Sequence, residues 1–194
     1  MARLSLAFSG HMPDQPDRET PRFPPDRVPA AEKAIANEVR RQSAAFAQKN
    51  VRAFASLARG GDIIFHEACR AQGVRSTVVL PFNAQEFLET SVGEEDGWLR
   101  RFAAIQNATP QGDWVVLDHP ASNAAYVACN EKILELAQAW GDARLIALWD
   151  GADGAQPQPG GADGAQPQPG GAGDFVRHVR ALKIKTIIID PSTL

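Results

Sequence analysis

Cysteine is scarce in this sequence. Only two cysteines occur in 194 residues, Cys69 and Cys129, and each lies inside a segment with helical periodicity. Structural disulfides are rare in a reducing compartment, where unpaired thiols persist and behave as small hydrophobic groups. We therefore expect a cytoplasmic protein in which both thiols are buried.

Long apolar runs are also missing. A membrane-spanning helix needs about 20 consecutive apolar residues, and no segment approaches that length. The apolar stretch in MARLSLAFSGHM is too short for a signal peptide and leads directly into a Gly-His turn. The sequence therefore predicts no membrane partner.

The sequence has no large excess of positive or negative charge. The formal net charge is −3 at pH 7, whereas proteins that bind a nucleic-acid backbone usually present a surplus of lysine and arginine. We therefore expect no nucleic-acid partner.

Common catalytic and metal-binding motifs are missing as well. The chain has no Gly-x-Ser-x-Gly elbow and no Gly-Lys-Ser/Thr loop, so a hydrolase triad and a P-loop site lack support. His66 and Cys69 lie three residues apart, but no second pair of ligands accompanies them. We expect neither a metal nor a bound cofactor.

Strand and helix patterns alternate along the whole chain. Apolar and β-branched runs predict strands at residues 3–8, 51–57, 74–82, 113–118, 143–150 and 185–190. Helical periodicity occurs at residues 30–49, 62–73, 84–89, 97–107, 123–140 and 173–182, and it predicts Trp98, Phe102 and Ile105 as core residues. This order predicts an α/β fold, a single Rossmann-like three-layer domain. Its sheet is expected to be mainly parallel, with about six strands and helices on both faces.

A ten-residue segment, GADGAQPQPG, occurs twice in succession, at residues 151–160 and 161–170. It has no apolar period, so it cannot bury one face. A solenoid usually needs about three or more repeats. We therefore expect one domain over residues 1–194, with residues 151–170 forming a flexible loop before the last helix.

Glycines and polar residues follow several predicted strands, which is where open α/β sheets bind ligands. The long segment SGHMPDQPDRETPRFP follows the first strand, and Gly60-Gly61 precedes a helix after the second. At Gly60-Gly61 two interpretations remain open. Either the backbone N–H groups bind an anion, or Asp62 caps the helix itself. A third glycine-rich segment, starting at Gly170, leads into the last helix.

These segments resemble one bacterial family. FSGHMPDQPDRETPRFP, SLARGGDIIFHEAC, VVLPF, FLETSV, WLRRF and IALWDG followed by PGG are similar, in order, to the motifs of SLOG-type Rossmann-like domains. The superfamily includes Lonely-guy phosphoribohydrolases and DNA-processing proteins. Its members are generally thought to bind nucleotides or nucleotide-derived signals, often beside tetratricopeptide repeats or signalling effectors. The resemblance thus implies an effector or repeat-domain partner and a possible homodimer.

The resemblance assigns ligand-binding roles to residues in matching motifs. The predicted ligand-binding residues are Ser9, Gly10, His11, Met12, Asp14, Arg18, Arg22, Gly60, Gly61, Asp62, Glu67, Asp150, Gly151, Gly170 and Gly171. The chain departs from the phosphoribohydrolase signature after Gly173, because Asp174 replaces a threonine and Arg177 replaces the catalytic glutamate. We therefore predict no catalytic residues.

Three classes of function remain open at this stage. The preferred one is a sensor module that binds a nucleotide or a nucleotide-derived signal without turnover. The alternatives are an N-glycosidase or phosphoribohydrolase that acts on a nucleotide, and a scaffold domain without a ligand. The sequence does not separate them, because base recognition depends on pocket walls that no motif marks.

Overall fold

The computed structural model describes residues 2–16, 18–93, 97–151 and 169–194. Six strands form one sheet: β1 (Leu4–Gly10), β2 (Val51–Ala55), β3 (Arg75–Leu80), β4 (Trp114–Val116), β5 (Asp142–Leu148) and β6 (Lys185–Ile189). The helices are α1 (Val28–Ser43), α2 (Gly61–Ala71), α3 (Ala84–Phe87), α4 (Trp98–Ala108), α5 (Asn123–Trp140) and α6 (Ala172–Ala181). A π-helical turn, Leu88–Val92, follows α3, and short 3₁₀ turns connect other elements.

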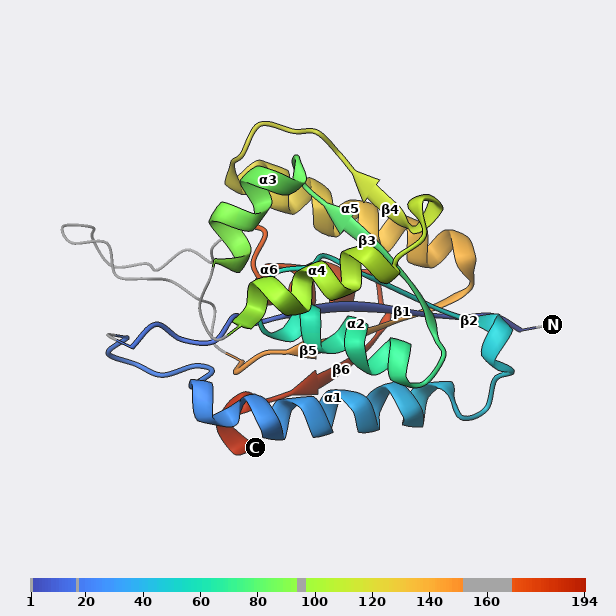
Figure 1. The fold of residues 1–194 in the computed structure, drawn as a ribbon. Coiled ribbons are helices and arrows are strands. Elements are labelled where there is room, and N and C mark those ends of the chain that lie inside the picture. The colour runs from blue at the N-terminus through green and yellow to red at the C-terminus, as the bar shows by residue number, and fades with distance from the viewer. Residues whose placement is uncertain (1, 17, 94–96, 152–168) are drawn as a thin grey trace.

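All strand pairings are parallel, in the order β4-β3-β2-β1-β5-β6. The chain builds outward from β1 to β4, and α5 then crosses back to place β5 on the other side of β1 (Figure 1). Parallel neighbours require such crossovers, which cover the faces of the sheet with helices. The predicted α/β fold is confirmed.

Two apolar cores lie on opposite faces of the sheet, because successive strand residues point to opposite sides. Leu6, Phe8, Ile146 and Leu148 face one core with residues of α1, α2 and α4. The residues between them along the strands, together with apolar residues of α5 and α6, form the second core. This is the three-layer arrangement that the alternating pattern predicted.

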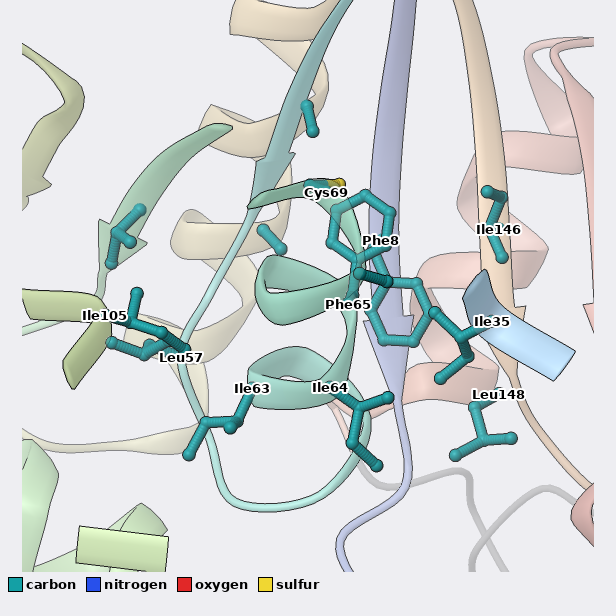
Figure 2. Close-up of a cluster of buried hydrophobic side chains, with 14 of the residues drawn as sticks. Phe8, Ile35, Leu57, Ile63, Ile64, Phe65, Cys69, Ile105, Ile146 and Leu148 are labelled. Carbon is teal, nitrogen blue, oxygen red and sulfur yellow. The ribbon is translucent and has the colours of Figure 1, made fainter. Parts of the chain in front are cut away.

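The larger core is centred on two stacked aromatic rings. Phe8 of β1 and Phe65 of α2 have ring centroids 4.6 Å apart and planes inclined by 13°. Figure 2 shows Ile35, Ile146 and Leu148 grouped around them. The stack therefore holds α2 against the centre of the sheet.

Several predicted side-chain positions are confirmed. Trp98, Phe102 and Ile105 are buried, and Cys69 and Cys129 are buried thiols. Burial raises the pKa of both thiols, that of Cys129 to about 12, so both stay protonated at neutral pH.

The predicted boundaries differ from the structure at one helix in particular. The helix predicted at residues 30–49 ends at Ser43, and Gln48–Asn50 forms a separate 3₁₀ turn. The chain must reverse here to enter β2, and the N–H of Phe46 closes the turn onto the carbonyl oxygen of Ser43 at 2.9 Å. The helix therefore ends before the helical sequence pattern does, because the chain has to turn toward β2.

One prediction is not tested by the fold. The flexible loop predicted at residues 151–170 falls largely on residues 152–168, which lie outside the described residues. Within the described ranges, no helix has both the length and the apolar character needed to cross a membrane.

We predict that Phe65→Ala lowers the free energy of unfolding by about 3–5 kcal/mol, since it removes a fully buried ring and leaves a cavity. Leu182→Ala is the control, because Leu182 is 50% exposed and its loss should cost less than about 1 kcal/mol. Urea denaturation of both variants measures the difference. Equal losses would contradict the central role of the Phe8–Phe65 stack.

Candidate functional site

The candidate site lies where β1 and β5 end side by side. The connection after β1 leads to β2 on one side, whereas the connection after β5 leads to β6 on the other. Such a reversal of strand order opens a crevice at the carboxyl ends of parallel strands, and ligands of doubly wound sheets bind there. Gly10 ends β1, and Trp149, Asp150 and Gly151 follow β5.

Three polar side chains meet at this point. The guanidinium of Arg22 donates to both carboxylate oxygens of Asp150, from Nε to Oδ2 at 2.7 Å and from Nη2 to Oδ1 at 3.0 Å. His11 Nε2 lies 3.0 Å from Asp150 Oδ1 and 3.0 Å from Arg22 Nη2. Residues separated by 128 positions thereby form one bidentate ion pair with an imidazole at its edge.

The triad of His11, Arg22 and Asp150 is partly accessible. The exposed fractions of the three side chains are 12%, 17% and 11%. Burial, followed by the neighbouring Arg22 charge, lowers the pKa of His11 below its ordinary value, although Asp150 opposes this shift. His11 is therefore neutral at physiological pH and can accept or donate a hydrogen bond.

Asp14 organises the loop that supplies Arg22. Its Oδ2 accepts hydrogen bonds from the backbone N–H groups of Arg22 and Phe23, both at 2.7 Å, and its Oδ1 lies 3.3 Å from Arg18 Nε. The N–H of Asp14 donates to the carbonyl oxygen of Phe23 at 2.8 Å. Asp14 and Arg18 therefore position the loop.

Three glycines bring this loop onto the start of α2. A Cβ on Gly61 would lie 2.9 Å from Cα of Gly10, and a Cβ on Gly60 would lie 2.6 Å from Cδ of Pro13. Gly60 also has φ of +84°, which side chains disfavour. The N–H of Gly61 donates to the carbonyl oxygen of His11 at 3.1 Å. Backbone thus packs directly on backbone here.

Asp62 is buried beneath this contact. Its Oδ2 accepts from the N–H of Ala58 at 3.2 Å, and the backbone of Gly10 is a second hydrogen-bond donor to it. Burial raises the pKa of Asp62 to about 7, although both hydrogen bonds oppose this shift. Asp62 does not cap α2, because the N-cap residue is Gly60 and no side chain caps the helix. The N–H groups of Gly61 and Ile63 donate instead to the carbonyl oxygens of His11 and Ala58, so backbone groups of the protein occupy the start of α2.

The glycine-rich segment that starts at Gly170 is also held by contacts within the protein. Gly170 donates its N–H to Asp174 Oδ2 at 2.9 Å, and its carbonyl oxygen accepts from Asn130 Nδ2 at 3.0 Å. A Cβ on Gly170 would lie 2.5 Å from Cβ of Tyr126. Gly170 and Gly171 therefore lie against α5, with a carboxylate at the start of α6.

Three other predicted residues lie at the carboxyl ends of β1 and β5, which we call the carboxyl edge, but they do not join the triad. Ser9 lies in β1 opposite Ala147 of β5, and the side chain of Met12 is exposed. Gly151 has φ of +81°, and no described atom lies within 4 Å of a Cβ placed on it.

Glu67 lies apart from this group. Its carboxylate is paired with Arg101, which also binds Glu32 of α1 and lies over the ring of Trp98. Glu67 lies too far along α2 to reach the carboxyl edge. It connects α1, α2 and α4.

His66 has a structural role in this geometry. Its Nε2 lies 2.9 Å from the carbonyl oxygen of Ser56 and must carry the proton, while Nδ1 accepts from the Ser76 hydroxyl at 2.9 Å. Burial lowers the pKa of His66 to about 4. Among the described residues, no three His, Cys, Asp or Glu side chains are grouped so that they would hold a metal ion.

The sequence did not predict the contacts of Tyr126, which lies next to Gly170. Tyr126 Oη and Ser91 Oγ are 2.8 Å apart, and the Tyr126 ring packs edge-on against Phe82. Tyr126 is the single tyrosine of the chain, but its partners lie far away in sequence. No local pattern indicates such contacts.

Comparisons with known proteins find similarity among solved structures. No family model matches the chain, and no curated protein matches it. Among solved structures, the chain is similar to DNA processing protein A (DprA) from Streptococcus pneumoniae, with 14% identity and a TM-score of 0.41. The match covers 95% of this chain and 58% of that chain.

One expectation from composition is corrected. A net charge of −3 led us to exclude a nucleic-acid partner, and the similar structure is that of a DNA processing protein. Net charge sums over the whole chain, whereas recognition depends on the local surface. Net charge therefore does not exclude a nucleic-acid partner, and we withdraw that expectation.

We predict that Gly60→Ala lowers the free energy of unfolding by about 2–4 kcal/mol, because the methyl group would clash with Pro13 at an already unfavourable φ. Gly151→Ala is a control with a similar φ and no described neighbour, and it should cost only about 1 kcal/mol. Chemical denaturation measures both. Equal losses would mean that φ, and not the backbone contact, decides the cost.

We also predict opposite pH dependences from Asp62 and His66. The raised pKa of Asp62 stabilises the protein below about pH 4 and this contribution is lost as the pH rises to about 7. The lowered pKa of His66 stabilises it above about pH 6.5 and this contribution is lost as the pH falls to about 4. Each group changes the free energy of unfolding by on the order of 3 kcal/mol over this pH range. The two changes have opposite signs, so they largely cancel in the unsubstituted protein.

Substitution separates the two effects. In Asp62→Asn the free energy of unfolding should rise between pH 4.5 and about 6.5, and in His66→Gln it should fall between about pH 4.5 and 7. Urea denaturation at a series of pH values tests this. A slope in Asp62→Asn that matches the unsubstituted protein would show that Asp62 is ionised in the folded state.

Proposed function

We propose that the chain binds a nucleotide or a nucleotide-derived signal at the carboxyl edge between β1 and β5 and releases it unchanged. The observation that carries the proposal is the meeting of His11, Arg22 and Asp150 at the point where strand order reverses. A doubly wound sheet opens its ligand crevice there.

The groups at this edge match the parts of a nucleotide. A carboxylate such as Asp150 accepts from ribose hydroxyls, and guanidinium groups such as Arg18 and Arg22 bind phosphate oxygens. Neutral His11 offers a further hydrogen bond. Because carbonyl oxygens of His11 and Ala58 accept from the first N–H groups of α2, the phosphate group is assigned to the arginines.

Binding without turnover is supported by the residues that would have to react. Phosphoribohydrolase chemistry needs a carboxylate at the reacting bond. Asp174 binds the N–H of Gly170 and contacts Arg177, which stands at the position of the catalytic glutamate. Glu67, the other candidate carboxylate, is paired with Arg101 away from the edge.

A thermal-shift screen tests the proposal, with nucleoside mono-, di- and cyclic phosphates, ADP-ribose, NAD and a single-stranded oligonucleotide as ligands. A ligand bound only by the folded state stabilises it by about 2.7 kcal/mol at a hundredfold excess over Kd. We expect at least one small nucleotide to raise Tm and to be recovered intact by chromatography.

Variants then locate the binding. Arg22→Gln should weaken binding about tenfold or more, because it removes charge-assisted hydrogen bonds. Arg27→Gln lies on the same segment, is exposed, and should bind as the unsubstituted chain does. Asp150→Asn is a near-isosteric second test, and denaturation confirms that each variant is folded.

The other outcomes distinguish the alternatives. Consumption of the ligand with release of free base would show a phosphoribohydrolase. A response to the oligonucleotide alone would indicate nucleic-acid binding. If no ligand raises Tm, the proposal fails and a scaffold role is favoured.

A further inference from the structure

A cavity lies at the other end of the sheet, near the amino ends of the strands. It has a volume of about 250 Å³ and opens between α2, α4 and the amino end of β3. Arg70 lines it from the last turn of α2, Arg75 and Ser76 from the start of β3, and Ile105 from α4. None of these residues belongs to the site between β1 and β5.

The charge of this cavity is positive. Asp113 is the one carboxylate among its lining residues, and it is fully buried. Arg52 binds Oδ1 of Asp113 and Arg75 binds Oδ2, so both of its oxygens are paired. Two lining arginines, Arg70 and Arg75, therefore face one carboxylate, whose charge Arg52 also balances from outside the lining. His66 stays neutral because burial lowers its pKa.

Two of the arginines retain donors at the cavity. Within the described ranges, Arg75 contacts Asp113 through Nε, and no hydrogen bond is made by its two Nη groups. Arg70 makes one long contact, from Nη1 to the carbonyl oxygen of Ala104 at 3.4 Å. Both side chains are exposed, so their guanidinium groups can bind an incoming anion.

Part of the lining is apolar. Val74, Ile105 and Ala108 line the cavity. A dry apolar cavity of about 150 Å³ accommodates benzene, so this one has room for a ring and an anionic group. Ligand pockets typically combine such a wall with a few placed polar groups.

We propose that this cavity binds a small organic anion, with its phosphate or carboxylate group between Arg70 and Arg75 and its apolar part against Val74 and Ile105. The site is separate from the proposed nucleotide site, since its lining lies at the amino end of β3. Either site can therefore exist without the other.

Amide chemical shifts in ¹⁵N-labelled protein test the proposal, with phenyl phosphate as the probe. Its addition should shift the amides of residues 73–76 and 105–109 in a saturable manner. Benzyl alcohol has the ring without the charge, and inorganic phosphate has the charge without the ring. Both should bind at least about tenfold more weakly.

Three variants sharpen the test. Arg70→Gln should weaken phenyl phosphate binding about tenfold, and Ala108→Phe should abolish it by filling the cavity. Both positions are exposed, so both variants are expected to fold. Arg40→Gln removes an exposed charge from α1 and should leave binding unchanged.

The proposal is overturned by any of three results. The first is the lack of a saturable shift at residues 73–76 and 105–109. The second is equal weakening by Arg70→Gln and Arg40→Gln, which would show unspecific attraction. The third is a shift confined to residues 10–12 and 150–151, which would place the probe at the nucleotide site.

Discussion

The contact between the end of β1 and the start of α2 constrains the rest of the carboxyl edge. Gly10 and Gly61 approach so closely that a Cβ on Gly61 would lie 2.9 Å from Cα of Gly10. The same approach lets the N–H of Gly61 reach the carbonyl oxygen of His11. Because His11 is held by its backbone, its imidazole reaches Asp150, and the loop that follows can return Arg22 to the same carboxylate.

Arginine–carboxylate networks stand at both ends of the sheet. At the carboxyl edge Arg22 holds Asp150, and at the amino edge Arg52 and Arg75 hold the buried Asp113. A buried carboxylate without such partners would be costly, whereas paired oxygens tolerate burial. Asp150 remains partly exposed, with 11% of its side chain accessible, while Asp113 is enclosed. The same kind of ion pair thus lies at the proposed binding site at one edge and in the buried structure at the other.

The first N–H groups of α2 are occupied by the protein's own carbonyl oxygens. The N–H groups of Gly61 and Ile63 donate to the carbonyl oxygens of His11 and Ala58. A helix N-terminus attracts an anion through its unpaired N–H groups and its dipole. When protein groups already accept from those N–H groups, a ligand must be held by other groups. This is the physical reason for assigning the proposed ligand to the loop after β1.

The sequence by itself determined the α/β class, the places of the six strands and the main core residues. Those features follow from local periodicity, as at Trp98, Phe102 and Ile105, which are buried as predicted. Motif order also brought His11, Arg22 and Asp150 into one predicted set. Only the tertiary structure decided that Arg22 and Asp150 pair, that Gly60 and Gly61 serve packing, and that Glu67 binds Arg101 instead of lining the edge. These outcomes depend on contacts between residues far apart in the chain, and a local pattern contains no information about which distant group each side chain will meet.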